Sequence, residues 1–214
     1  TPNAQVCYRG DSSIDGVPGT AAAVPLLFSG LAGSKCGSLL PTGNSVDVIA
    51  DISCTMIDNG MPTVVIAARD LGLNGDEAPE QLEADPKLTS RIEALRLKAG
   101  PMMNLGDVSK QSVPKICIVS APIYGGIIHT RCFIPHSCHR TIGVLCAVSV
   151  ATACLLDHGP ATEVAEVSVA PKLSLDIEQP SGSLPVLLRL DANGQVVEAG
   201  NIRTTRKLFD GLVF

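Results

Sequence analysis

Aromatic residues are almost missing from this chain of 214 residues: tryptophan is absent, and the aromatic fraction is 3%. A core must therefore be assembled from valine, isoleucine, leucine and alanine, which contribute to a hydrophobic fraction of 45%. Charged residues are also scarce, at 17%. This composition excludes a disordered chain, and the length allows one large domain or two small ones.

The chain also lacks any run of basic residues, and its formal net charge is −5. Binding to nucleic acid or to an anionic membrane surface depends on concentrated positive charge, so we expect no partner of either kind. The most apolar run, 142–156, is shorter than the ~20 residues that cross a bilayer, and it contains Ser149 and Thr152. We therefore expect no transmembrane helix.

Cys-x-x-Cys pairs are absent, although the chain has eight cysteines. Most of these lie inside apolar runs, as Cys117 does between two isoleucines and Cys146 does within 144–147. Cysteines in such runs behave as small buried hydrophobic residues. We therefore expect free thiols, a reducing compartment and a cytoplasmic location.

Twenty glycines and 15 prolines divide the chain into short segments. Runs of β-branched and aliphatic residues between these breaks predict strands. The predicted strands are 4–10, 22–28, 52–57, 63–67, 115–120, 127–133, 164–169, 173–178, 184–190 and 195–202, with a final one at the end of 203–214. Apolar residues spaced three or four apart predict an amphipathic surface helix over 86–98 that ends before Gly100 and Pro101.

The segment 141–156 is apolar on every side, which is typical of a helix at the centre of a core. Thr141 is its predicted N-cap, and Gly159 and Pro160 follow its end. Many strands around one apolar helix, with one further helix on the surface, predict an α+β fold rather than alternating βαβ units.

A group of basic and thiol side chains precedes this apolar helix. It consists of Arg131, His136, Cys138, His139 and Arg140. The N-terminus of a helix carries the positive end of the helix dipole and several unpaired N–H groups. The combination predicts a binding site for a carboxylate at this end of the helix.

Four members of the group also have a purely structural explanation. Cys138 is either a thiolate activated by the helix N-terminus or an inert thiol. His136 and His139 either orient a substrate and move a proton, or bond to backbone. Arg131 either clamps a carboxylate or forms a surface salt bridge. Zinc binding by 132–139 is the weaker alternative, because structural zinc sites use two separated ligand pairs.

Six short motifs occur along the chain in a recognisable order. They are Val17-Pro18-Gly19-Thr20, Leu40-Pro41-Thr42-Gly43-Asn44, Asp58-Asn59-Gly60-Met61-Pro62, Ser112-Val113-Pro114-Lys115, His139-Arg140-Thr141-Ile142-Gly143-Val144 and Arg203-Thr204-Thr205-Arg206-Lys207. In order and spacing they resemble the PrpF-type isomerases over nearly the whole chain. The resemblance implies a diaminopimelate epimerase-like fold, in which a curved β-sheet wraps around a long apolar central helix and the active site lies between two such domains.

The resemblance also implies an activity. It is that of a cofactor-free isomerase that shifts a proton on an unsaturated or keto tricarboxylic acid, with keto–enol tautomerisation of 4-oxalomesaconate in gallate degradation as the specific reaction. The alternatives are an aconitate-type double-bond isomerase and a non-catalytic module that binds polycarboxylates. We expect a di- or tricarboxylate as the small-molecule partner, no cofactor, no metal, and a homodimer.

Two sets of site residues follow from the same resemblance. The catalytic candidates are His139 and Cys138. The expected substrate-binding residues are Thr42, Gly43, Asn44, Asn59, Met61, Arg131, His136, Thr141, Ile142 and Gly143. The last three would supply backbone N–H groups, although many relatives carry Gly-Thr-Gly where this chain has Thr-Ile-Gly.

Family members are longer at the N-terminus, so the chain resembles the C-terminal portion of such an enzyme. On this basis 1–45 is expected to end an incomplete N-terminal domain, 46–200 to form a C-terminal epimerase-like domain, and 201–214 to return to the first domain. The segment that carries the lysine and cysteine of proton transfer in relatives has no counterpart here. We therefore expect the fragment alone to be inactive.

Overall fold

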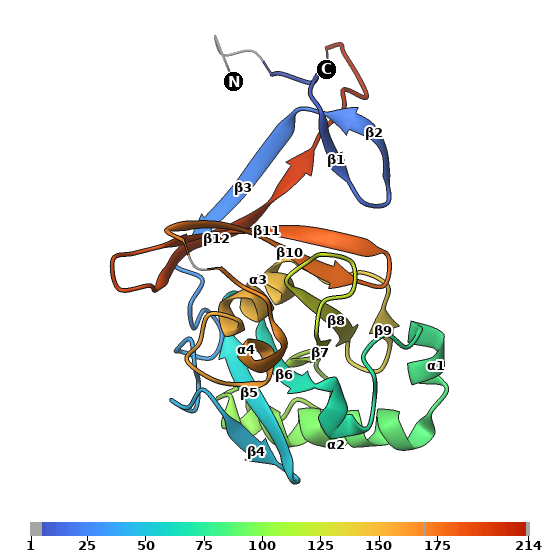
Figure 1. The fold of residues 1–214 in the computed structure, drawn as a ribbon, viewed down its shortest axis with the longest axis vertical. Coiled ribbons are helices and arrows are strands. Elements are labelled where there is room, and N and C mark those ends of the chain that lie inside the picture. Colours follow the sequence, from blue (N-terminus) through green and yellow to red (C-terminus); the bar gives the residue numbers. More distant parts are fainter. Residues whose placement is uncertain (1–5, 169, 213–214) are drawn as a thin grey trace.

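A mixed β-sheet organises the computed structural model, which describes residues 6–168 and 170–212 (Figure 1). Its strand order is β3-β12-β11-β10-β8-β7-β6-β5-β4, and β9 pairs with β8. The pairs β6–β7 and β8–β10 are parallel, and the other neighbours are antiparallel. The strands are β3 (Ala23–Ser29), β4 (Asp47–Ile49), β5 (Ile52–Asp58), β6 (Pro62–Ala67), β7 (Lys115–Ser120), β8 (Ile128–Phe133), β9 (Cys138–His139), β10 (Lys172–Gln179), β11 (Gly182–Leu190) and β12 (Val196–Thr204).

Helices cover the two faces of this sheet. They are α1 (Pro79–Glu83), α2 (Pro86–Met102), α3 (Val144–Ala153) and α4 (Pro160–Val164), with a short 3₁₀ helix η2 (Ala68–Leu71). A separate hairpin, β1 (Ser12–Ile14) with β2 (Val17–Ala21), lies beside the far end of β3 (Figure 1). Within the described part of the chain, none of these helices is long and apolar enough to span a membrane.

The central strands are apolar along their whole length because both of their faces are buried. On β6, Val65 packs in the same cluster as α3, whereas Val64 and Ile66 pack in the cluster that contains α2. On β7, Cys117 packs in the cluster that contains α3, and Ile118 packs in the cluster that contains α2. Side chains alternate between the faces of a strand, so one continuous apolar run supplies two cores.

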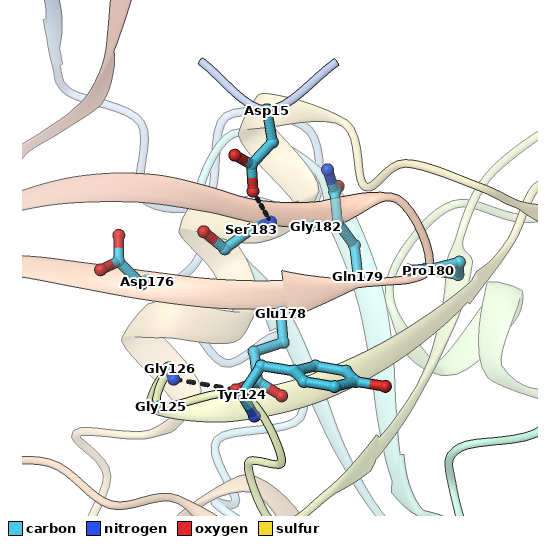
Figure 2. Close-up of a pocket in the computed structure, with 10 residues that line it drawn as sticks. All are labelled: Asp15, Tyr124, Gly125, Gly126, Asp176, Glu178, Gln179, Pro180, Gly182 and Ser183. Carbon is cyan, nitrogen blue, oxygen red and sulfur yellow. Dashed lines mark hydrogen bonds between the residues drawn. The ribbon is translucent and has the colours of Figure 1, made fainter. Parts of the chain in front are cut away.

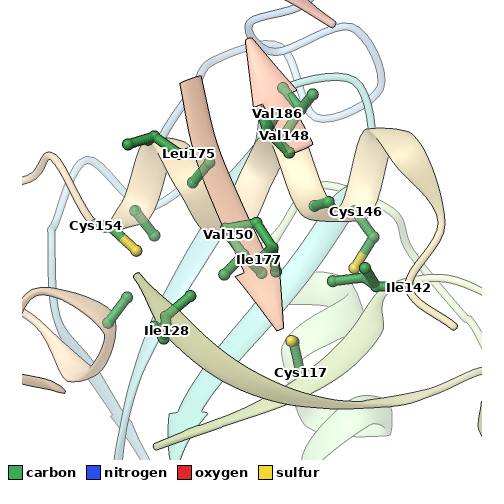
Figure 3. Close-up of a cluster of buried hydrophobic side chains, with 14 of the residues drawn as sticks. Cys117, Ile128, Ile142, Cys146, Val148, Val150, Cys154, Leu175, Ile177 and Val186 are labelled. Atoms are coloured by element: carbon green, nitrogen blue, oxygen red, sulfur yellow. The ribbon is translucent and has the colours of Figure 1, made fainter. Parts of the chain in front are cut away.

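Helix α3 lies at the centre of the first core. It contacts β5 and β6 on one side and β10, β11 and β12 on the other, so the sheet encloses it (Figures 1 and 3). Residues 146–153 are all buried. The central helix was predicted over 141–156, but α3 has ten residues and its N-cap is Gly143 rather than Thr141. The Ile142 N–H donates a hydrogen bond to the Gln179 side chain, which fixes the preceding residues outside the helix.

Eight predicted strands are confirmed with small shifts at their ends: β3, β5, β6, β7, β8, β10, β11 and β12. Three predicted strands are wrong in the part that the structure describes. Residues 6–10 and 205–212 form no strand, and 165–168 follow α4 without regular structure. The remaining residues of those predictions, 4–5, 169 and 213–214, lie outside the described residues. The strands β1, β2, β4 and β9, which have two to five residues each, were not predicted.

The surface helix α2 is confirmed, but its predicted end is wrong. The helix passes through Gly100 and Pro101 to Met102. Gly100 packs so closely on Val108 that an added Cβ would lie 2.5 Å from its Cγ2. This packing holds the last turn together despite the N–H that proline lacks.

Candidate active site

The N-terminus of α3 presents backbone N–H groups at the surface. Gly143 is extended, with φ −67° and ψ 143°, and no side chain caps the helix. Thr141 and Gly143 are exposed and Val144 is half-buried. Among the described residues, no hydrogen-bond acceptor is recorded for the N–H groups of Gly143, Val144 and Leu145. This end of the helix is therefore open to an anion.

The turn between β10 and β11 fixes the backbone that enters α3. The Gln179 Oε1 accepts a 2.6 Å hydrogen bond from the Ile142 N–H. The Ser181 N–H donates to the Arg140 carbonyl oxygen at 3.1 Å. Thus Thr141 lies between two attachment points on one hairpin turn. Gln179 was not predicted as a site residue, because no sequence signal marks it beyond its place directly after the predicted strand 173–178.

A buried carboxylate, Glu178, lies on β10 directly before Gln179. Glu178 accepts hydrogen bonds from the N–H groups of Ile123, Tyr124 and Gly126 at 2.8, 2.6 and 2.8 Å. It also contacts His129 Nδ1 at 2.9 Å. Burial by itself would raise the pKa of Glu178, but the hydrogen bonds outweigh it and the pKa is lowered. Glu178 is therefore a carboxylate at neutral pH.

This carboxylate and an arginine share one histidine between them. Arg131 Nη1 lies 2.6 Å from His129 Nε2. A guanidinium only donates, so Nε2 must accept and the proton of the neutral ring must be on Nδ1, facing Glu178. Burial lowers the pKa of His129, which agrees with a neutral ring. The arrangement is a chain of hydrogen bonds from Arg131 through His129 to Glu178.

Arg131 is buried, and its recorded partners are His129 and the carbonyl oxygens of Glu77 and Thr130, with Nε donating to Glu77 at 2.6 Å. It is therefore not held by a surface salt bridge, which was one of its two predicted explanations. It lines a cavity of about 360 Å³ together with Arg140. Ser181 and Tyr124 also line this cavity, so it borders the turn that holds the start of α3.

A second cavity, of about 400 Å³, lies beside the first and shares Tyr124 with it (Figure 2). Its walls carry Asp15, Asp176 and Glu178. Asp15 comes from the hairpin of β1 and β2, and it accepts a hydrogen bond from the Ser183 N–H at 2.7 Å. Three carboxylates would repel an anionic substrate. The cavity with the two arginines is therefore the better receptor for a carboxylate, although Asp76 and Glu80 also line it and Glu80 pairs with Arg140.

The histidine and cysteine candidates lie on different faces. His136 is 66% exposed in its side chain, and its Nδ1 lies 3.6 Å from Glu93 Oε2. His139 is exposed on β9, opposite Cys132. Cys138 is buried, and burial raises its pKa to about 11, so it is a protonated thiol at neutral pH. In the described residues no three candidate ligands lie close enough to hold a metal ion.

The predicted loop residues lie along α3 and near β4. The Asn59 N–H donates to Ser149 Oγ at 3.1 Å, and its Nδ2 donates to Thr152 Oγ1 at 2.8 Å. Ser149 Oγ in turn donates to the Met61 carbonyl oxygen at 2.8 Å. These bonds fasten the turn between β5 and β6 to the helix.

The loop before β4 closes around one carboxylate. Thr42 Oγ1 and Asn44 Nδ2 donate to the two oxygens of Asp47 at 2.6 and 2.9 Å. Gly43, between them, has a φ of 80°, which favours glycine. The structure therefore brings Arg131 and 141–143 to the β10–β11 turn. It gives Asn59 and Met61 partners on the middle of α3, and Thr42 and Asn44 a partner on β4.

Comparison with known proteins gives one family. A family model described as PrpF protein matches residues 1–214. The chain is 52% identical over 214 residues to a (4E)-oxalomesaconate Delta-isomerase of Novosphingobium sp. (strain KA1), covering all of this chain and 60% of that protein. It is 52% identical over 213 residues to a 4-oxalomesaconate tautomerase of Pseudomonas putida, covering all of this chain and 59% of that protein.

A solved structure shares the fold. It is described as a methylitaconate-delta-isomerase and superimposes with a TM-score of 0.88 at 25% identity, covering 99% of this chain and 60% of that one. The chain thus spans about 60% of the length of the curated relatives and of this structure.

The bonds of Ser149 give a first testable prediction. Ser149→Ala leaves the buried Asn59 N–H without its acceptor and removes one of the two hydrogen bonds to the Met61 carbonyl oxygen, so we expect the free energy of unfolding to fall by about 1–3 kcal/mol. Urea denaturation measures this. Ser53→Ala, on the exposed face of β5, is the matched control and should change stability by less than about 0.5 kcal/mol. Equal effects of the two substitutions would contradict the role of Ser149.

The lowered pKa of Glu178 gives a second prediction, on pH. A carboxylate with a lowered pKa in the folded state stabilises the fold above its unfolded pKa of about 4.3, and this contribution is lost as the pH falls through the folded value. Glu178→Gln should therefore cost about 2 kcal/mol at pH 7 and progressively less below about pH 4. Asp176→Asn, exposed on the same strand, is the control. A pH-independent loss in Glu178→Gln would contradict the assignment.

Proposed function

Because the chain belongs to the PrpF family, we propose that it is part of a cofactor-free isomerase that shifts a proton on an unsaturated or keto tricarboxylic acid. The observation that carries the proposal is 52% identity over the whole chain to two proteins named for 4-oxalomesaconate. The specific reaction we propose is keto–enol tautomerisation of 4-oxalomesaconate, in gallate degradation and hence aromatic catabolism. Eight free cysteines support a reducing, cytoplasmic setting.

The proposed chemistry needs fixed positive potential where an enolate develops. The open N–H groups of Gly143, Val144 and Leu145 provide it at the N-terminus of α3, together with the helix dipole. Arg131, held by His129, would bind a second carboxylate from the neighbouring cavity. Several fixed positive groups suit a substrate with more than one carboxylate.

Proton transfer is assigned to two neighbouring residues of β9. His139 is exposed and can exchange a proton with a bound substrate. Cys138 is protonated at neutral pH because burial raises its pKa to about 11. In this proposal Cys138 is therefore a donor of a proton or a hydrogen bond rather than the base. His136, Thr42, Gly43, Asn44, Asn59 and Met61 complete the proposed substrate-binding set.

We also propose a domain division at 45 and 200, with 201–214 returning to the first domain. Exposed apolar side chains support it: Leu26, Leu27 and Phe28 on β3, and Leu208 and Phe209 near the end of the described chain. Apolar patches of this kind normally pack against other polypeptide. By itself the chain would then bind substrate without turnover. We further propose a homodimer, which the molar mass in solution tests.

The two relatives are equally similar to this chain, at 52% identity, but one is named a tautomerase and the other a Delta-isomerase. Both reactions remove a proton at one carbon and return one elsewhere, so the same site can serve either. The proton NMR spectrum of the product formed in deuterium oxide separates them by the position of the new deuterium. Binding of the tricarboxylate without any incorporation would instead favour a non-catalytic binding module.

His139→Ala is the third prediction. In the enzyme that contains this chain, the substitution should lower kcat by at least about 10²-fold, because it removes the proposed proton-transfer group without disturbing the core. The rate is followed by deuterium incorporation into 4-oxalomesaconate. His158→Ala, an exposed histidine after α3, is the control and should leave the rate unchanged. An unchanged rate in His139→Ala would remove this residue from the mechanism.

A further inference from the structure

Three cysteines meet behind the proposed site, and the proposed reaction uses none of them. They are Cys117 on β7, Cys132 on β8 and Cys146 in the first turn of α3. Cys117 and Cys132 are direct partners across two antiparallel strands. The Sγ atoms of Cys132 and Cys146 lie 3.6 Å apart. Figure 3 shows Cys146 and Cys117 in the core below the helix.

The surroundings favour a thiolate at Cys146. Cys117 and Cys132 direct their thiols toward it, and Thr63 Oγ1 lies 3.6 Å from its sulfur. These hydrogen bonds, with the charge of Lys115 nearby, outweigh burial and lower the pKa of Cys146. Its position in the first turn of a helix acts in the same direction. The other two thiols have raised pKa values, so Cys146 is the nucleophile of the group.

We propose that Cys132 and Cys146 form a redox modification site, a dithiol that hydrogen peroxide converts to a disulfide. The Cys146 thiolate attacks one peroxide oxygen, breaks the O–O bond and becomes a sulfenic acid, and hydroxide leaves and takes up a proton to become water. The Cys132 sulfur then attacks the Cys146 sulfur, and the sulfenic oxygen leaves as a second water. Two thiols are oxidised and one peroxide is reduced.

The geometry permits this closure. The two sulfurs must approach from 3.6 Å to the ~2.05 Å of a disulfide bond, which side-chain movement can provide. Both residues are 2% exposed. However, Cys146 lies only three residues after the exposed N-cap Gly143, and hydrogen peroxide is little larger than water, so peroxide can reach it from this end of the helix. The Sγ–Sγ distance of 3.6 Å makes Cys132 the expected resolving thiol.

The disulfide would act on the proposed site, and this consequence rests on the proposed function. Residues 133–145 lie between the two cysteines, so the bond would close a ring that contains Cys138, His139 and 141–143. A covalent ring of this size restricts the conformations of the segment within it. Oxidation would thus fix the loop that presents substrate-binding N–H groups and the candidate proton-transfer residues.

To test this proposal, the folded chain is treated with hydrogen peroxide and then unfolded in the presence of an alkylating reagent, which blocks the remaining free thiols. Disulfides are then mapped by mass spectrometry. We expect a Cys132–Cys146 cross-link that dithiothreitol reverses. Amide hydrogen exchange within 138–145 should slow about tenfold on oxidation. Neither measurement depends on catalysis, so failure here is distinguishable from failure of the proposed isomerase activity.

Matched variants complete the test. Cys146→Ser and Cys132→Ser should each abolish the cross-link, and circular dichroism establishes that they fold; either variant is sufficient if the other does not. Cys154→Ser, buried at the other end of α3, should leave the cross-link intact. Full alkylation of Cys132 and Cys146 after peroxide treatment would overturn the proposal. So would a cross-link between Cys117 and Cys132.

Discussion

The hydrogen bond from the Ile142 N–H to the Gln179 side chain determines where the central helix begins. It holds the backbone that enters the helix against the β10–β11 turn, and the chain is still extended at Gly143. The first free N–H groups of the helix are therefore displaced to 143–145, at the surface. The acceptor lies 37 residues away in the chain, on the β10–β11 turn. The site's geometry thus depends on the closing of that hairpin against the helix entry.

The two-sided burial of the central strands explains why this end of the helix lies at an edge. Strands β6 and β7 serve both cores at once, so side chains from both faces are committed to packing. Several polar groups of the site lie where a strand ends or a turn begins. Glu178, Gln179 and Arg140 all occupy such places. The arginines and the open amides then lie together at the β10–β11 turn, at the edge of the packed sheet.

Local patterns predicted most of the framework and little of the site. Strand β7 was predicted at its observed bounds, because Ile, Cys, Ile and Val in sequence have no competing interpretation. The start of α3 was misplaced since its determinant, Gln179, is remote in the chain. Cys138 was a candidate thiolate from its basic neighbours, but those neighbours do not compensate for its burial, and its pKa is raised. The local sequence pattern predicts neither the burial of a side chain such as Cys138 nor a long-range contact such as that of Gln179.

The Arg131 network shows how a buried guanidinium is oriented without a direct hydrogen bond to a carboxylate. A direct ion pair with Glu178 would satisfy the hydrogen bonds of the guanidinium and neutralise its charge. Instead neutral His129 separates the two, with Nδ1–H toward the carboxylate and Nε2 toward Arg131. The remaining hydrogen-bond partners of Arg131 are carbonyl oxygens, and the carboxylates of Asp76 and Glu77 lie near it. The guanidinium is fixed in direction and its charge remains available to the cavity that it shares with Arg140, which is what recognition of a carboxylate requires.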